Sequence, residues 1–299
     1  MNENMTAQNQ ICVSPARAPG GAGPRRVLLE LDDGYLTPMY IFAPAGEASG
    51  PPVVYAHGIQ SHPLWFFGSA SALAAAGRAV YLVTRRGSGE NTVHRGHCRS
   101  AAQLLDDVET ACKFAMRDSA SDRVCLLGVS WGGKLMLAYA LNRPDAPISR
   151  LILVAPGIYS RHDVSGLAKM RIALALLTRP AAMFDIPLGR PELFTSNEQF
   201  QQYLRDDSLS LLRASARFLY ASRTIDRMIS RARPRSLAVP VLLMLAADDR
   251  IIFNRPTESL VGALAGSSCE VITLGGSHTL EFEANARPFF DSLVEMSAK

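Results

Sequence analysis

Residues 124–133, VCLLGVSWGG, join a short apolar stretch to the helical pattern KLMLAYAL at 134–141. A serine in a tight turn between a strand and a helix has a strained backbone, so the residues two positions away must be small. Gly128 and Gly132 supply that space around Ser130. The start of the helix also directs free N–H groups and a positive dipole end toward the hydroxyl. An ordinary glycine-rich turn can carry Gly-x-Ser-x-Gly by chance, but this context predicts that Ser130 is a nucleophile.

Apolar strands alternate with helical patterns on both sides of this turn. The apolar stretches are continuous runs of valine, isoleucine and leucine, which is typical of strands buried on both faces of a parallel sheet. An Asp-Asp-Gly turn also predicts a hairpin between the first two strands. We therefore expect an α/β fold with a mostly parallel central sheet flanked by helices. Strands are expected at 26–31, 35–42, 52–56, 79–84, 124–129, 151–154, 239–245 and 271–274, and helices at 65–76, 101–117, 131–141, 255–264 and 282–296.

Two parts of the chain depart from this rhythm. Residues 1–25 are polar, rich in proline and glycine and without periodicity, so we expect a flexible tail there. Residues 158–237 show several helical patterns and no strand-like run, and a stretch of this length is too long for a simple connection. The sequence thus predicts a core made of residues 26–157 and 238–299, with a helical cap inserted at 158–237.

A serine nucleophile needs a base, and the base needs a carboxylate that orients it. His278 lies directly after the last expected strand, and Asp248 and Asp249 follow the strand before it. The order serine, aspartate, histidine along the chain is the order that this type of serine turn requires. We expect His278 as the base and Asp249 as the acid, with Asp248 as the alternative acid. The other readings are a helix-capping aspartate and a solvated loop histidine.

Two backbone N–H groups are needed to stabilise the negative charge that develops on the substrate oxygen. The N–H of Trp131, directly after the serine, is expected to be one donor. The N–H of Ile59 is expected to be the other, because it lies in the loop HGIQ after an apolar strand and Gly58 lets that loop approach. His57 lies early in the chain for a base, so we expect it to brace this loop by hydrogen bonding.

The chain resembles the α/β-hydrolase family, and within it the lysophospholipase or monoacylglycerol-lipase-like branch. The motifs that carry the resemblance are HGIQ (57–60), TRRGSG (84–89), GVSWGG (128–133), AADDRII (246–252) and GGSH (275–278). The expected insertion falls where this family carries its cap. One departure is Thr84, where many relatives have an acidic residue.

The resemblance implies a serine hydrolase that cleaves a carboxylic ester or thioester through an acyl-enzyme, without a cofactor or metal. An acyltransferase, an amidase or a peptidase could use the same three side chains. A peptidase that holds a free amino terminus would need carboxylates in the cap, for which Glu192, Glu198, Asp206 and Asp207 are candidates. A ligand-binding member of the fold without activity is the remaining alternative.

Composition limits the other classes of function. The 299 residues are 48% hydrophobic with a formal net charge of +4, which excludes a mostly disordered chain and does not favour nucleic acid as a partner. No apolar run approaches the roughly 20 residues that cross a bilayer, and no signal peptide is recognisable. Five cysteines without a C-x-x-C pattern favour reduced thiols and a cytoplasmic protein. The motif HRGHC (94–98) has no partner cluster for zinc.

The expected cap is basic. Residues 160–236 contain thirteen arginines and lysines against seven aspartates and glutamates. Arg223, Arg227 and Arg231 are spaced four residues apart, on one helix face. Such a face is either simply solvated or guides an anionic partner, namely an acidic carrier protein, an anionic lipid or a membrane surface. An apolar stripe in the same segment either lines an acyl pocket or packs the cap on the core, and its members are Met170, Leu174, Leu177 and Met183.

Overall fold

The computed structural model describes residues 23–298. The tail expected at 1–25 therefore lies almost entirely outside the described residues. Of the helices that the structure describes, none is both long enough and apolar enough to cross a membrane.

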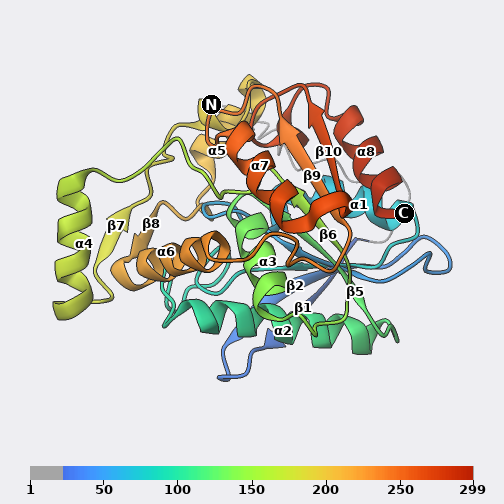
Figure 1. The fold of residues 1–299 in the computed structure, drawn as a ribbon, viewed down its shortest axis with the longest axis horizontal. Coiled ribbons are helices and arrows are strands. Elements are labelled where there is room, and N and C mark those ends of the chain that lie inside the picture. The colour runs from blue at the N-terminus through green and yellow to red at the C-terminus, as the bar shows by residue number, and fades with distance from the viewer. Residues whose placement is uncertain (1–22, 299) are drawn as a thin grey trace, which may run out of the picture.

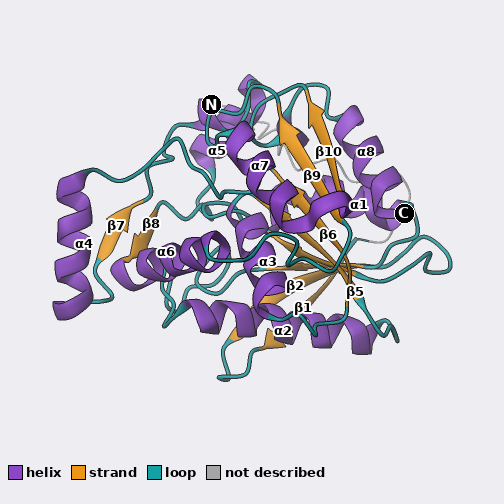
Figure 2. Ribbon diagram, in the orientation of Figure 1, coloured by secondary structure: helices purple, strands orange, loops and turns teal. Residues whose placement is uncertain are grey.

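An eight-stranded sheet runs through the centre of the molecule (Figures 1 and 2). Its strand order is β1-β2-β4-β3-β5-β6-β9-β10; the first two pairings are antiparallel and the rest parallel, which confirms the predicted sheet. The strands β3, β4, β5 and β9 are almost wholly buried, as their continuous apolar sequences predict. The bounds are β1 Arg25–Glu30, β2 Leu36–Phe42, β3 Val53–Ala56, β4 Val80–Val83, β5 Val124–Val129, β6 Ile148–Val154, β9 Val241–Ala246 and β10 Cys269–Leu274.

Helices cover the sheet. Helix α2 has an apolar face that packs against α3, and α1 packs against α8. The predicted hairpin between β1 and β2 is confirmed, and its turn places Gly34 at φ 77°, a conformation that glycine adopts without strain. The bounds are α1 Phe67–Ala75, α2 Ala101–Asp118, α3 Trp131–Asn142, α7 Asn254–Ala265 and α8 Arg287–Ala298.

Between β6, which ends at Val154, and β9, which begins at Val241, the chain leaves the sheet, and residues 158–237 of this connection are named the inserted segment. Its helices α4, α5 and α6 agree with the expectation of several helices, but the expectation that it contains no strand is wrong. Strands β7 and β8 pair antiparallel beside α4 and α6, at the left of Figure 1. Each has only three residues, too few for a recognisable alternation. The bounds are α4 Gly166–Thr178, β7 Met183–Asp185, α5 Glu198–Asp206, β8 Arg213–Ser215 and α6 Ala216–Ser230.

The HRGHC motif fastens the inserted segment to the core. The N–H of Ser215 donates to the Gly96 carbonyl at 2.8 Å, and Nδ1 of His97 lies 2.8 Å from the Ser215 hydroxyl. The guanidinium of Arg95 donates to the carbonyl of Leu209 at 2.9 Å. A side chain on Gly96 would collide with the backbone of β8. These contacts give the motif a structural role.

Glu281 ties the loop that carries His278 to helix α1. One carboxylate oxygen accepts the Ser69 N–H at 2.9 Å, and the other accepts the Ser69 hydroxyl at 2.6 Å. Burial raises the pKa of Glu281 to about 7, although the bonds from Ser69 favour its ionised form. Because the folded pKa lies above the unfolded one, the folded chain binds this proton more tightly. Glu281 therefore makes the free energy of unfolding fall as the pH rises from about 4.5 to about 7.

Glu281→Gln is expected to remove this pH dependence, because an amide does not ionise. Relative to the wild type, the variant should gain about 3 kcal/mol in the free energy of unfolding between pH 4.5 and pH 8. Urea unfolding at both pH values measures it. Glu283→Gln is the matched control with the opposite sign: despite burial, hydrogen bonds from Ser196 hold the pKa of Glu283 below its ordinary value. Equal pH dependence in the wild type and Glu281→Gln would contradict this prediction.

Candidate active site

Ser130 occupies the turn between β5 and α3 with φ 55° and ψ −122°. Residues that carry a side chain rarely adopt this backbone conformation. A Cβ on Gly128 would lie 2.6 Å from the Gly132 carbonyl oxygen, and one on Gly132 would collide with the carbonyl oxygens of Ala56 and His57. Both glycines are therefore required for this turn, as predicted from the sequence. The turn holds the serine at the edge of the sheet, where a cavity opens.

His278 and Asp249 form a buried pair at the same edge. Nδ1 of His278 lies 2.8 Å from Oδ2 of Asp249, whose Oδ1 accepts the N–H groups of Ile251 and Ile252 at 2.7 and 2.9 Å. Burial opposes ionisation of Asp249, but the imidazole and the two amides hold its pKa below the ordinary value. A carboxylate can only accept, so Nδ1 carries the proton. Nε2 is then the basic nitrogen, and it is buried without a hydrogen-bond partner in the described chain.

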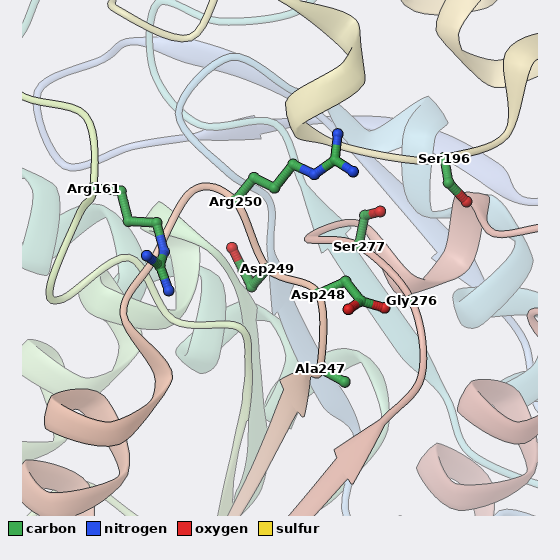
Figure 3. A pocket seen from close by; sticks show the side chains of 8 residues that line it. All are labelled: Arg161, Ser196, Ala247, Asp248, Asp249, Arg250, Gly276 and Ser277. Atoms are coloured by element: carbon green, nitrogen blue, oxygen red, sulfur yellow. The ribbon is translucent and has the colours of Figure 1, made fainter.

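Asp248 lies apart from this pair. Its side chain is exposed, and Figure 3 shows it pointing to the other side of the loop from Asp249, beside Ser277. Its N–H donates to the Gly276 carbonyl at 3.0 Å, which joins the loops that follow β9 and β10. Of the two aspartates, only Asp249 contacts the imidazole.

His57 sets the orientation of the Ile59 N–H. Its Nε2 accepts the backbone N–H of Arg85 at 3.0 Å, so its proton is on Nδ1, which donates to the Gly58 carbonyl at 2.9 Å. Because the peptide is trans, fixing the Gly58 carbonyl turns the Ile59 N–H to the opposite side. Burial and the charge of Arg85 lower the pKa of His57 well below its ordinary value, which keeps the ring neutral. The hydrogen-bonding role expected for His57 is thus confirmed.

The loop of residues 57–60, the expected oxyanion loop, approaches the Ser130 side chain closely. A Cβ built on Gly58 would lie 3.3 Å from Cβ of Ser130. Ile59, Ser130 and Trp131 line one cavity of about 790 Å³. The N–H groups of Ile59 and Trp131 make no hydrogen bond within residues 23–298, so both are free to bind a substrate oxygen.

The cavity has an apolar and a polar wall. The apolar wall comes mostly from the inserted segment and includes Ile172, Leu176, Ile186, Leu188, Leu219 and Ile252. On the polar wall, Ser222 Oγ accepts hydrogen bonds from Nε1 of Trp131 and from Nζ of Lys134, each at 2.9 Å. The same Nζ lies 2.8 Å from Oδ1 of Asp226. Sequence reasoning missed this cluster. Its one local signal is the spacing of four residues from Ser130 to Lys134, which places both on one face of α3.

Several residues expected in or near the pocket lie elsewhere. Met170, Leu174 and Leu177 are 63% to 86% exposed on the outer face of α4, and neither they nor Met183 line the cavity. Helix α4 is apolar on more than one face, so its pattern did not reveal which face docks.

Of the charged side chains expected to contact a substrate, some line the cavity and others do not. Arg223 and Arg227 line the cavity, but Arg231 does not. None of the carboxylates considered for a peptide amine lines it, namely Glu192, Glu198, Asp206 and Asp207. The side chain of Asp207 is instead 5% exposed and accepts hydrogen bonds from the rings of His62 and Trp65 at 2.9 and 2.8 Å. It joins the inserted segment to the residues that follow the loop 57–60.

Solved structures of lipases share this fold. The structure of the Paleococcus ferrophilus monoacylglycerol lipase superposes with a TM-score of 0.76 at 19% identity, covering 88% of this chain and 98% of that one. A soluble variant of the Saccharomyces cerevisiae monoglyceride lipase gives 0.79 at 18% identity, covering 95% and 97%. The fold is therefore the α/β-hydrolase fold, as the sequence motifs implied.

Curated relatives match parts of the chain. A monoacylglycerol lipase of Mycolicibacterium smegmatis is 31% identical over 123 residues, which is 41% of this chain and 42% of that lipase. Phospholipase YtpA of Bacillus subtilis is 26% identical over 181 residues, 60% of this chain and 68% of that phospholipase. The matched region thus spans less than half of the mycobacterial lipase. The model of the family described as serine aminopeptidase S33 matches residues 50–285. Since this match covers most of the chain, the chain belongs to the serine aminopeptidase S33 family of hydrolases.

Proposed function

We propose that the chain is a serine hydrolase that cleaves a carboxylic ester or thioester through an acyl-enzyme intermediate. The observation that carries the proposal is the buried Asp249–His278 pair. Its basic Nε2 makes no hydrogen bond within residues 23–298, and the pair lies at the same edge of the sheet as Ser130, which lines the cavity. The lipases and the phospholipase among its relatives support ester chemistry. Residues 158–237 act in this proposal as the cap over the site.

In the proposed reaction, Oγ of Ser130 attacks the carbonyl carbon while Nε2 of His278 takes the hydroxyl proton. Asp249 holds the Nδ1–H and stabilises the imidazolium, and the N–H groups of Ile59 and Trp131 bind the oxyanion. The intermediate collapses as the imidazolium gives its proton to the departing alcohol or thiol. Water, activated by the same nitrogen, then hydrolyses the acyl-enzyme. No residue in this sequence of steps requires a cofactor.

The cavity supports an acyl ester with a polar alcohol part, because it offers both an apolar and a polar wall. It does not favour a peptide with a free amino terminus. The two carboxylates that line the cavity already form ion pairs with lysines: Asp226 lies 2.8 Å from Lys134, and Asp163 lies 2.5 Å from Lys169. Neither is left to hold a substrate amine.

A substrate series tests the proposal. Turnover of p-nitrophenyl esters from acetyl to palmitoyl, of monoacylglycerols, and of amino-acid p-nitroanilides should show ester cleavage with a chain-length optimum. A fluorophosphonate probe should label the wild type, and Ser130→Ala should abolish labelling. Cleavage of the anilides without the esters would refute the proposal.

We also propose that the basic cap guides an anionic substrate, either an anionic lipid or the acyl group of an acidic carrier protein. Arg223 and Arg227 line the cavity, and the four basic and two acidic side chains of its lining leave an excess of positive charge. A cytoplasmic location is proposed on the free cysteines, since Cys98, Cys112, Cys125 and Cys269 form no disulfide with one another in the described part of the chain.

The charge proposal predicts a salt effect. The Debye length falls from about 10 Å at 0.1 M salt to about 3 Å at 1 M, so kcat/KM for an acyl glycerol phosphate should fall several-fold relative to that for the matching monoacylglycerol. Arg223→Gln with Arg227→Gln should lower this ratio at low salt and make it independent of salt. Arg231→Gln with Arg233→Gln is the matched control, because it also removes two positive charges, just beyond the end of α6 and outside the cavity lining. If salt does not change the ratio of the two kcat/KM values in the wild type, these arginines are only solvated and the charge proposal is wrong.

A further inference from the structure

Arg85 carries a buried guanidinium that forms no ion pair with a carboxylate in the described chain. Its side chain is 7% exposed, and its hydrogen bonds go to backbone carbonyls: Nη2 to Ile59 at 2.7 Å and Nη1 to Arg86 at 3.5 Å. Arg86, the next residue, instead pairs with both Asp33 and Asp107. The two arginines are adjacent in sequence, but only one of them has its charge neutralised.

Aromatic faces take the place of the missing carboxylate. The guanidinium carbon of Arg85 lies 5.0 Å from the ring centroid of Trp131 and 4.9 Å from that of Phe218. Such contacts stabilise a desolvated cation, because the faces of aromatic rings carry partial negative charge. Burial lowers the pKa of Arg85 only to about 10, so the side chain stays charged at neutral pH.

These contacts join Arg85 to both residues that supply the oxyanion N–H groups. It holds the carbonyl of Ile59 by a charge-assisted hydrogen bond, and it stacks on the indole of Trp131. Its own backbone N–H fixes the tautomer of His57, which orients the Gly58–Ile59 peptide. One residue thus braces the oxyanion loop through its backbone and through its side chain.

We propose that Arg85 is the positioning residue of the oxyanion hole, and that its unpaired charge favours the negative tetrahedral intermediate over the neutral ester. This inference rests on the proposed function. A fixed charge in a medium of low dielectric acts more strongly than one in water. The ester carbonyl is neutral when it binds and negative in the transition state, so the effect belongs to kcat and leaves KM nearly unchanged.

Arg85→Met removes the charge and the hydrogen bond, and Arg85→Lys keeps the charge. We expect Arg85→Met to lower kcat for a neutral p-nitrophenyl ester by about 10- to 100-fold, somewhat less than the loss of a direct oxyanion donor, with KM within about threefold. Its affinity for an alkyl boronic acid, which forms an anionic tetrahedral adduct with a catalytic serine, should fall by a similar factor. Arg85→Lys should recover part of both losses.

Arg78→Met is the matched control. Arg78 precedes β4 where Arg85 follows it, is equally buried, and donates to the carbonyls of Pro51 and Ser297. Its replacement should lower Tm while kcat and boronic acid affinity stay at wild-type values. The proposal is overturned if Arg85→Met keeps wild-type boronic acid affinity, or if Arg78→Met loses as much kcat.

A second variant of Arg85 and fluorophosphonate labelling of Ser130 complete the experiment. If Arg85→Met does not fold, Arg85→Gln, which removes the charge but keeps N–H donors, decides alone: a kcat loss paralleled by weaker boronic acid binding supports the proposal, and wild-type values for both overturn it. Fluorophosphonate labelling of the wild type comes first. Failure to label Ser130 overturns the proposed function together with this inference, whereas labelling followed by unaffected Arg85 variants overturns this inference alone.

Discussion

Ser130→Ala is expected to leave a folded protein with almost no esterase activity. The hydroxyl is the atom that bonds to the acyl carbon, and removing it should lower kcat by roughly 10⁶-fold, as in other enzymes with this set of side chains. A residual acceleration of about 10³- to 10⁴-fold over water should remain from binding and the oxyanion hole. The turn itself should persist, because alanine has the same Cβ in the same strained conformation. Steady-state turnover and thermal unfolding of both proteins measure this.

A second serine in the cavity provides the control. Ser222→Ala removes a hydroxyl from the polar wall and must still be labelled by a fluorophosphonate, since the nitrogen beside Ser222 is the ammonium of Lys134, which already pairs with Asp226. An alanine variant at position 130 with most of the wild-type turnover, or one that is still labelled, would refute the nucleophile.

Asp249→Asn is expected to lower kcat by about 10⁴-fold, whereas Asp248→Asn should have little effect. The asparagine oxygen can still accept the N–H groups of Ile251 and Ile252. Its NH₂ group then faces Nδ1 of His278 and donates to it, which moves the imidazole proton to Nε2. A ring protonated at Nε2 cannot take the proton of Ser130.

Asp248→Asn is the neighbouring control because its side chain is exposed and makes no contact with the imidazole. Both variants should unfold within a few degrees of the wild type. Comparing their kcat values decides the assignment, and the reverse ranking would transfer the acid role to Asp248.

The parts of the site that could be predicted from the sequence are those fixed by local geometry and strand order. A serine between glycines at 128 and 132 has one compatible turn, and the loops after parallel strands gather at one edge of the sheet. The sequence therefore predicted that His278 and an aspartate after β9 would meet. It favoured Asp249 by resemblance, and the structure pairs that residue with the imidazole at 2.8 Å.

What could not be predicted depends on how separate elements dock. Ser222 and Asp226 reach Lys134 only because α6 packs on α3. The stripe through Met170 and Leu174 faces outward because tertiary packing, rather than periodicity, selects the buried face of an apolar helix. The unpaired charge of Arg85 could not be predicted either, since two adjacent arginines give no sign of which one finds a carboxylate.

The position of β9 and β10 has a consequence during synthesis of the chain. Strands β6 and β9 are neighbours in the sheet, but the whole inserted segment separates them in sequence. As the N-terminal part leaves the ribosome first, the serine turn and the oxyanion loop can form long before Asp249 and His278 have been made. A nascent or truncated chain that ends before β9 holds the proposed nucleophile without its base. Under the proposed function, the ability to attack esters is therefore acquired only after the last two strands have been made.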